Sequence, residues 1–179
     1  RIKSKKVMVM GQGIDTEVFK PDTTKRSESL SILSVGRIAP IKNYEVLVNA
    51  VKILRDDGVG FHLKIIGEPV FPKDFKYQEK LKNMAIEINL DQHVSFLGKI
   101  IHKELPSHYQ TSHIFVNLGQ TGSLDKTIVE AMACGVNVIS SNDAAIKFLP
   151  KDLIVSGDDS KELAEKIKEI SNKDFGAEL

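Results

Sequence analysis

Short hydrophobic runs alternate with segments of helical spacing along most of the chain. The run LSILSV at 30–35 predicts a strand, and behind it Leu47, Ala50, Val51 and Leu54 repeat at the i, i+3, i+4 and i+7 positions of one helix face. The same alternation continues to the end of the chain. Further strands are predicted at 6–10, 61–66, 93–97, 114–116, 136–139 and 153–155, and further helices around 81–88, 102–109, 128–133 and 163–170.

Strand and helix alternate at the length of βαβ units, without hairpin signals or an internal repeat. The sequence therefore predicts one α/β domain over residues 1–179, with a Rossmann-like parallel sheet and helices on both faces. Such sheets bind ligands beyond the carboxyl ends of their strands. The candidate positions are the polar residues that follow each strand: Arg37, Lys42 and Asn43, then Glu68, then Lys99 and Ile100, then 119–126, and finally 140–143.

Composition and charge exclude several classes of protein. Lys and Arg total 25 against 24 Asp and Glu, so the net charge of +1 gives no reason to expect nucleic acid as a partner. No apolar run approaches the roughly 18 residues of a transmembrane helix. The single Cys134 excludes an internal disulfide and suits a reducing compartment. Because the chain does not begin with Met, we expect a piece of a longer protein.

Familiar catalytic motifs fit poorly. The segment GQGIDT at 11–16 has two glycines of the dinucleotide fingerprint, but Thr16 replaces the third and Pro21 interrupts the helix that should follow. LDKT at 124–127 lacks the glycines of a phosphate loop. The five histidines show no metal-binding spacing, one cysteine cannot build a zinc site, and no G-x-S-x-G elbow is present. The sequence predicts neither a hydrolase nor a metal centre.

The remaining candidates suit phosphate. Arg37 and Lys42 share one strand-to-helix turn, and they combine a planar fork for phosphate oxygens with a compact point charge. Gly122 and Ser123 precede a helix whose free N–H groups favour an anion. Glu130 interrupts the apolar face of that helix. Glu130 either faces solvent or accepts hydrogen bonds from paired sugar hydroxyls. For the whole set, the residues alone leave two alternatives open, a nucleoside-diphosphate site or ordinary surface charges.

The ordered set of motifs resembles the C-terminal domain of retaining glycosyltransferases of glycosyltransferase family 4, which have the GT-B fold. Residues 13–21 resemble the opening N-G-[IV]-D-x-x-x-F-x-P, with Gln12 in place of Asn. Residues 35–42 resemble V-G-R-L-x-x-x-K, and IIGEP at 65–69 resembles I-I-G-x-G-P shortened by one glycine. VSFLG at 94–98 and EAMACGVNVI at 130–139 also match, and the last is the most specific element.

The resemblance implies a role for each matching residue in binding a nucleoside-diphosphate sugar, without cofactor or metal. Arg37 and Lys42 would neutralise the departing diphosphate as catalytic groups. Glu130 would hold the ribose hydroxyls, and the backbone of Ile100 would touch the base. The other implied donor-binding positions are Gly36, Gly67, Gly122, Ser123 and Leu124.

One departure affects sugar recognition. The family commonly has a second Glu eight positions before Glu130, within E-G-x-G-L, and here that position is Gly122. Asp125 and Lys126 are candidate substitutes for donor binding. The loss leaves open a different class, a Rossmann-like module that binds a nucleotide or a partner without catalysis.

The resemblance also implies a missing partner domain. The acceptor, a sugar or a lipid-linked glycan, would be bound by an N-terminal domain that this chain lacks, so we expect no transfer by the chain alone. We expect a cytoplasmic protein, with contact to the cytoplasmic membrane face through that domain as a further option.

Overall fold

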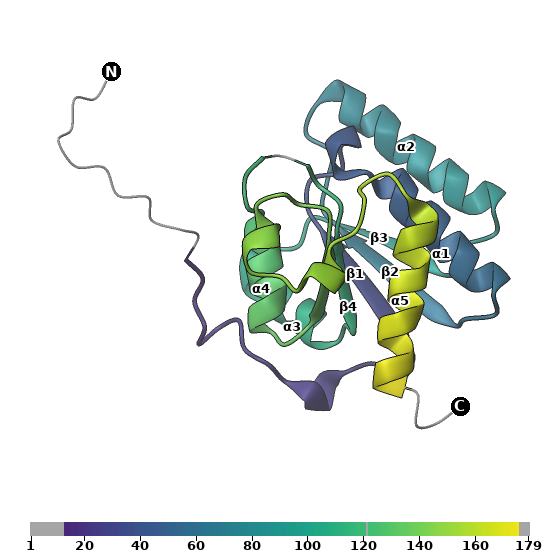
Figure 1. Cartoon of the computed structure of the whole chain (residues 1–179). Helices are drawn as coiled ribbons and strands as arrows, with labels where there is room; N and C mark the ends of the chain where they lie inside the picture. Colours follow the sequence, from purple (N-terminus) through teal and green to yellow (C-terminus); the bar gives the residue numbers. More distant parts are fainter. Residues whose placement is uncertain (1–12, 121, 176–179) are drawn as a thin grey trace, which may run out of the picture.

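The computed structural model describes residues 13–120 and 122–175 (Figure 1). The strand expected at 6–10 and Gly11 lie outside the described residues. Five strands form one sheet, in the order β3-β2-β1-β4-β5 and with every pairing parallel, which confirms the predicted sheet. The strands are β1 Leu30–Val35, β2 Phe61–Ile66, β3 Val94–Gly98, β4 Ile114–Asn117 and β5 Asn137–Ser140.

Helices cover both faces of the sheet, as expected (Figure 1). One face packs against α1 Tyr44–Asp56, α2 Pro72–Glu87 and α5 Ser160–Phe175, and the other against α3 Leu105–Gln110 and α4 Lys126–Ala133. All six residues of the central strand β1 are buried. Ile32 joins the core under α1, while Leu33 joins the core under α4, because successive side chains point to opposite faces.

Two expected elements differ from the prediction. Residues 153–155 do not form a strand, because a 3-10 turn occupies Lys151–Leu153 and the following Ile154 makes only an isolated bridge with Ser140. The helix expected at 102–109 divides into a 3-10 turn, His102–Glu104, and α3. Pro106 explains the division, because it lacks an N–H and is tolerated only in the first turn of a helix.

The order of the strands determines where ligands can reach the sheet. From β1 the chain continues to β2 and β3 on one side, whereas β4 and β5 lie on the other side. A crevice forms at such a reversal, outside the carboxyl ends of β1 and β4. None of the described helices is long and apolar enough to cross a membrane.

Candidate functional site

A hollow of about 360 Å³ lies at this reversal of strand order. It is lined by Val35, Gly36, Arg37, Ile41, Lys42, Asp125, Lys126 and Thr127. The structure therefore brings together residues that follow β1 and residues that follow β4. A larger hollow of about 460 Å³ is lined by residues of α2 alone, so it is a groove between the side chains of one helix.

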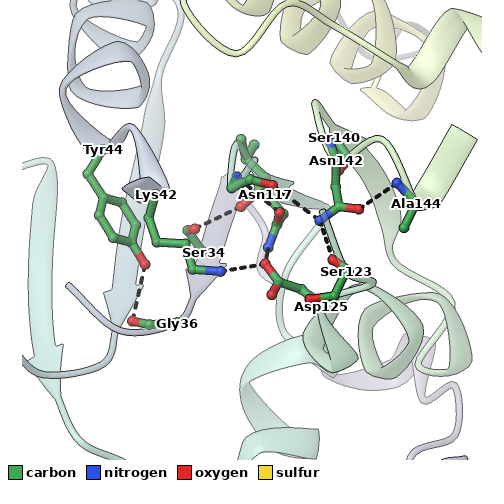
Figure 2. Close-up of polar contacts among 12 residues, drawn as sticks. Ser34, Gly36, Lys42, Tyr44, Asn117, Ser123, Asp125, Ser140, Asn142 and Ala144 are labelled. Atoms are coloured by element: carbon green, nitrogen blue, oxygen red, sulfur yellow. Dashed lines mark hydrogen bonds and ion pairs between the residues drawn. The ribbon is translucent and has the colours of Figure 1, made fainter. Parts of the chain in front are cut away.

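Lys42 is held by an acidic partner from the opposite side of the hollow (Figure 2). Its Nζ lies 2.5 Å from Oδ2 of Asp125, and the same oxygen accepts a hydrogen bond from Asn117 Nδ2 at 2.9 Å. The exposed fractions of the two charged side chains are 14% and 19%. A Cβ at Gly119 would lie 3.0 Å from Lys42 Nζ, so the absence of a side chain at Gly119 makes room for the pair.

The local sequence fixes the position of Lys42. A 3-10 turn spans Pro40–Lys42, and Asn43 adopts a left-handed conformation with φ of 50° before α1 begins. The side chain of Asn43 donates to the carbonyl of Gly157 at 3.0 Å, which ties the turn to the segment before α5. The short turn thus returns the chain over the end of β1.

Arg37 lies at the open rim of the hollow, with 42% of its side chain exposed. Its guanidinium carbon lies 5.4 Å from the centre of the Phe71 ring, a cation–π geometry, and its Nε lies 3.9 Å from Oδ2 of Asp74. Asp74 is fully buried, and its Oδ2 accepts the Phe71 N–H at 3.2 Å. Its Oδ1 meets no hydrogen-bond donor among the residues that the structure describes. Arg37 therefore keeps most of its donors available.

Gly36 and Gly67 bring the ends of β1 and β2 into backbone contact. The Gly36 N–H donates to the Ile66 carbonyl at 2.9 Å, and a Cβ at Gly67 would lie 1.9 Å from the Gly36 carbonyl oxygen. That oxygen also accepts the Tyr44 hydroxyl at 3.2 Å (Figure 2). Burial raises the pKa of Tyr44 well above its usual value, which keeps the hydroxyl a donor. Gly67 thus has a packing role that the sequence did not predict.

The loop between β4 and α4 ends at Asp125. Gly122 and Ser123 precede α4, as predicted, but not directly, because α4 begins at Lys126 with Asp125 at its N-cap. Asp125 makes no side-chain capping hydrogen bond, since its carboxylate turns toward Lys42 and Asn117. Leu124 is likewise outside the helix.

Asn142, just beyond β5, holds both sides of this loop (Figure 2). Its side chain is fully buried, and Nδ2 donates to the Gly119 carbonyl at 3.1 Å and to the Ser123 carbonyl at 2.9 Å. Its Oδ1 accepts the Ala144 N–H at 2.9 Å. The loop beside the hollow is therefore anchored to the neighbouring strand end.

Glu130 is buried, with an exposed fraction of 2%, so the interpretation that it faces solvent was wrong. Its Oε1 lies 2.7 Å from His102 Nε2, and its Oε2 accepts the Tyr109 hydroxyl at 3.0 Å. Lys126 Nζ lies 3.9 Å from Oε1. Burial and the negative charge of Glu130 raise the pKa of Tyr109, so its hydroxyl stays protonated and donates.

His102 and Tyr109 are partners that the sequence did not reveal. They precede Glu130 by 28 and 21 residues, at no recognisable spacing. The signal available in the sequence was a glutamate on an apolar helix face, because a carboxylate buried there requires hydrogen-bond donors. Ile100 is half-buried near this cluster, two residues before His102, and does not line the hollow. Of the predicted residues, the hollow is lined by Gly36, Arg37, Lys42, Asp125 and Lys126, and Lys126 connects it to the separate Glu130 cluster. Gly67, Gly122, Ser123 and Leu124 do not line the hollow.

Among the described residues, no group of three or more His, Cys, Asp or Glu side chains is placed to hold a metal ion. Cys134 is buried, and burial followed by the charge of Glu130 raises its pKa to about 11. A thiol with this pKa is almost entirely protonated near neutral pH and is a poor nucleophile.

Several solved structures are similar to this chain in fold. The C-terminal domain of LpcC, a group 1 family glycosyl transferase from Francisella tularensis, superposes with a TM-score of 0.78 at 26% identity, covering 91% of this chain and 90% of that one. Alr3699/HepE from Anabaena, solved with UDP and glucose, gives a TM-score of 0.79 at 19% identity over 92% of this chain and 46% of that one, which is a likeness of fold. The fold is that of the C-terminal half of a GT-B glycosyltransferase.

Curated proteins with similar sequences point to the same group of enzymes. A GDP-mannose-dependent alpha-(1-6)-phosphatidylinositol monomannoside mannosyltransferase of Mycobacterium tuberculosis is 26% identical, over 88% of this chain and 45% of the relative. The mannosylfructose-phosphate synthase of Agrobacterium fabrum is 26% identical, over 77% of this chain and 33% of the relative. The chain therefore spans less than half the length of either. Residues 15–178 match the family model described as glycosyl transferases group 1, and the chain belongs to that family.

Proposed function

We propose that the chain is the donor-binding domain of a retaining glycosyltransferase that transfers a hexose from a nucleoside-diphosphate sugar. The observation that carries the proposal is the hollow at the reversal of strand order, where Arg37, Lys42 and Lys126 converge. Three cations against the single carboxylate of Asp125 give the lining a positive balance, which suits a diphosphate.

The chemistry assigned to these side chains is electrostatic. As the bond between the sugar and the diphosphate breaks, negative charge grows on the leaving phosphate oxygens. Arg37 offers a planar fork at the exposed rim, and Lys42 offers a point charge at the inner wall. Preorganised positive groups stabilise that charge in the transition state, and this role needs no divalent metal ion.

The Glu130 cluster would then recognise the ribose. Its carboxylate lies one helical turn from Lys126, which lines the hollow. Ribose hydroxyls would take over the hydrogen bond that His102 now makes with Glu130, because the His102 side chain is 56% exposed and therefore reachable from solvent. Ile100, two residues before His102, would lie beside the base.

The acceptor belongs to the proposal for the whole protein. The relatives are more than twice as long as the stretch they share with this chain. We infer that a second domain binds the acceptor, a sugar or lipid-linked glycan, and closes over the donor. The phosphatidylinositol monomannoside in the name of one relative supports a role in glycan biosynthesis. We place the protein in the cytoplasm, in keeping with its single cysteine.

A second candidate is a nucleotide-binding module without catalysis. It is favoured by one observation: Lys42 and Glu130 are both already paired within the protein. Transfer assays distinguish the two. The full-length protein should transfer sugar from the donor that binds best, whereas the chain alone should not, because half of a cleft cannot position both substrates. Full-length rates from the chain alone would contradict this division of labour.

Calorimetric titration with UDP, GDP and ADP tests the site directly. Lys42→Met and Arg37→Met should each weaken the tightest diphosphate by about ten- to a hundredfold, the effect of losing one charged hydrogen bond. Lys52→Met is the matched control, because Lys52 pairs with Asp56 on its own helix and does not line the hollow. Equal affinity in all three variants would exclude this hollow as the diphosphate-binding site.

A further inference from the structure

The carboxylate of Asp125 occupies the position in which Lys42 would bind an anionic ligand. Its Oδ2 accepts hydrogen bonds from Lys42 Nζ at 2.5 Å and from Asn117 Nδ2 at 2.9 Å (Figure 2). Lys42 is the innermost cation of the hollow, with an exposed fraction of 14%. Any phosphate oxygen that approaches Lys42 therefore meets a carboxylate already in place.

The contact is built into the fold. Exposed ion pairs contribute little, but here the carboxylate also bonds Asn117, a residue of β4 that is only 3% exposed. Asp125 stands at the N-cap of α4, where a carboxylate normally accepts helix N–H groups, yet it makes no such bond. Asn142 anchors the loop that precedes Asp125 through its hydrogen bonds to the Gly119 and Ser123 carbonyls.

We propose that Asp125 is an internal competitor for Lys42. Without a ligand it takes the place that a phosphate oxygen takes in the complex, so it lowers the affinity of the hollow for diphosphates and favours their release. The inference rests on the proposed function in one respect, that the hollow accepts a diphosphate. It assigns Asp125 the opposite role from a sugar-reading residue or a residue that only positions Lys42.

The sign of the effect separates these roles. Two unit charges about 4 Å apart near a protein surface interact strongly enough to change an affinity by on the order of a thousandfold. Losing one charged hydrogen bond that positions Lys42 changes it by about ten- to a hundredfold. The repulsion is the larger of the two effects. Removing the charge of Asp125 should therefore tighten the binding of a diphosphate, by about tenfold or more.

Asp125→Asn and Asp125→Ser test this in the 179-residue chain. Asparagine keeps one acceptor for Lys42, and serine keeps a favourable N-cap, so the pair guards against a failure of one variant to fold. Calorimetry with pyrophosphate, UDP and GDP should show tighter binding in both. Asp91→Asn is the charge-matched control, because exposed Asp91 precedes β3, at the amino ends of the strands, and it should bind as the unchanged chain does.

Each outcome decides one claim. If the unchanged chain binds UDP or GDP and both Asp125 variants bind equally or more weakly, the competitor role is overturned and the proposed function stands. If the variants bind pyrophosphate more tightly while no protein binds a nucleotide, the competitor role stands and the proposed function falls. If neither the chain nor its variants bind any of the three ligands, both are overturned.

Discussion

Gly67 and Gly36 touch through their backbones. A Cβ at Gly67 would lie 1.9 Å from the Gly36 carbonyl oxygen, and the φ of Gly67 is 144°, a conformation that residues with side chains rarely adopt. The contact joins the ends of β1 and β2 directly before Arg37. Two glycines thus determine where the rim of the hollow lies.

Gly67→Ala should lower the free energy of unfolding by about 2–4 kcal/mol, because it adds both a steric clash with Gly36 and backbone strain. Gly60→Ala is the matched control, since a Cβ there would meet no atom within 4 Å and its φ is not in the left-handed region. Urea unfolding followed by circular dichroism measures both. Equal stability of the two variants would contradict the close contact.

Asn142→Ala should destabilise the protein by about 1–3 kcal/mol, because the Gly119 and Ser123 carbonyls each lose a buried donor. The same loss should expose the loop before α4 to limited proteolysis. Asn83→Ala, at an exposed position of α2, should change stability by less than about 0.5 kcal/mol. If cleavage in the loop is no faster in Asn142→Ala than in Asn83→Ala, Asn142 does not hold the loop.

Glu130→Gln should weaken the binding of nucleoside diphosphates while the protein stays folded. The amide retains one acceptor oxygen for Tyr109, and it removes the charge from the proposed ribose contact. Glu79→Gln, on the exposed surface of α2, is the control. Titration should also show weaker binding of a 2′,3′-dideoxyribose diphosphate than of its parent nucleotide. Equal binding of those two ligands would exclude the ribose assignment.

Stability should fall as the pH drops through about 6.5. Burial, followed by the charge of nearby Lys64, lowers the pKa of both His62 and His108 in the folded protein. Below the usual histidine pKa the unfolded chain therefore binds more protons, which favours unfolding. Stability from this source is complete above pH 6.5 and is lost as the pH falls. Denaturation midpoints at pH 7.5 and 5.5 should differ less in the His62→Gln, His108→Gln double variant, and an unchanged difference would refute the assignment.

Nucleotide binding should not require a divalent metal ion, because Arg37, Lys42 and Lys126 supply positive charge to the hollow. Titrations with chelator present should give the same affinity as titrations without it. Restoration of a lost affinity by magnesium or manganese would show that the cations of the chain are insufficient.

The sequence predicted the fold well because burial on both faces makes β1 and its neighbours continuous hydrophobic runs. The position of Arg37 and Lys42 beside the hollow was also predictable, since both lie in the turn that follows β1. The ion pair of Lys42 with Asp125 was not, because its members are 83 residues apart and meet only through the strand order. The contacts of His102 and Tyr109 with Glu130 were not predictable either, because these residues are also distant in the sequence and meet only in the folded chain.

The 83 residues between Lys42 and Asp125 also have a consequence for folding kinetics. The β1–β2–β3 half of the sheet can form with Gly36 and Gly67 in contact, yet the inner wall of the hollow does not exist until β4 pairs with β1. Parallel pairings across such long chain segments form slowly, because the entropy of closing the segment is lost first. A ligand of the hollow binds only the completed sheet and stabilises it by mass action. During refolding, the recovery of ligand binding should therefore report the joining of β1 and β4, later than the recovery of helical circular dichroism.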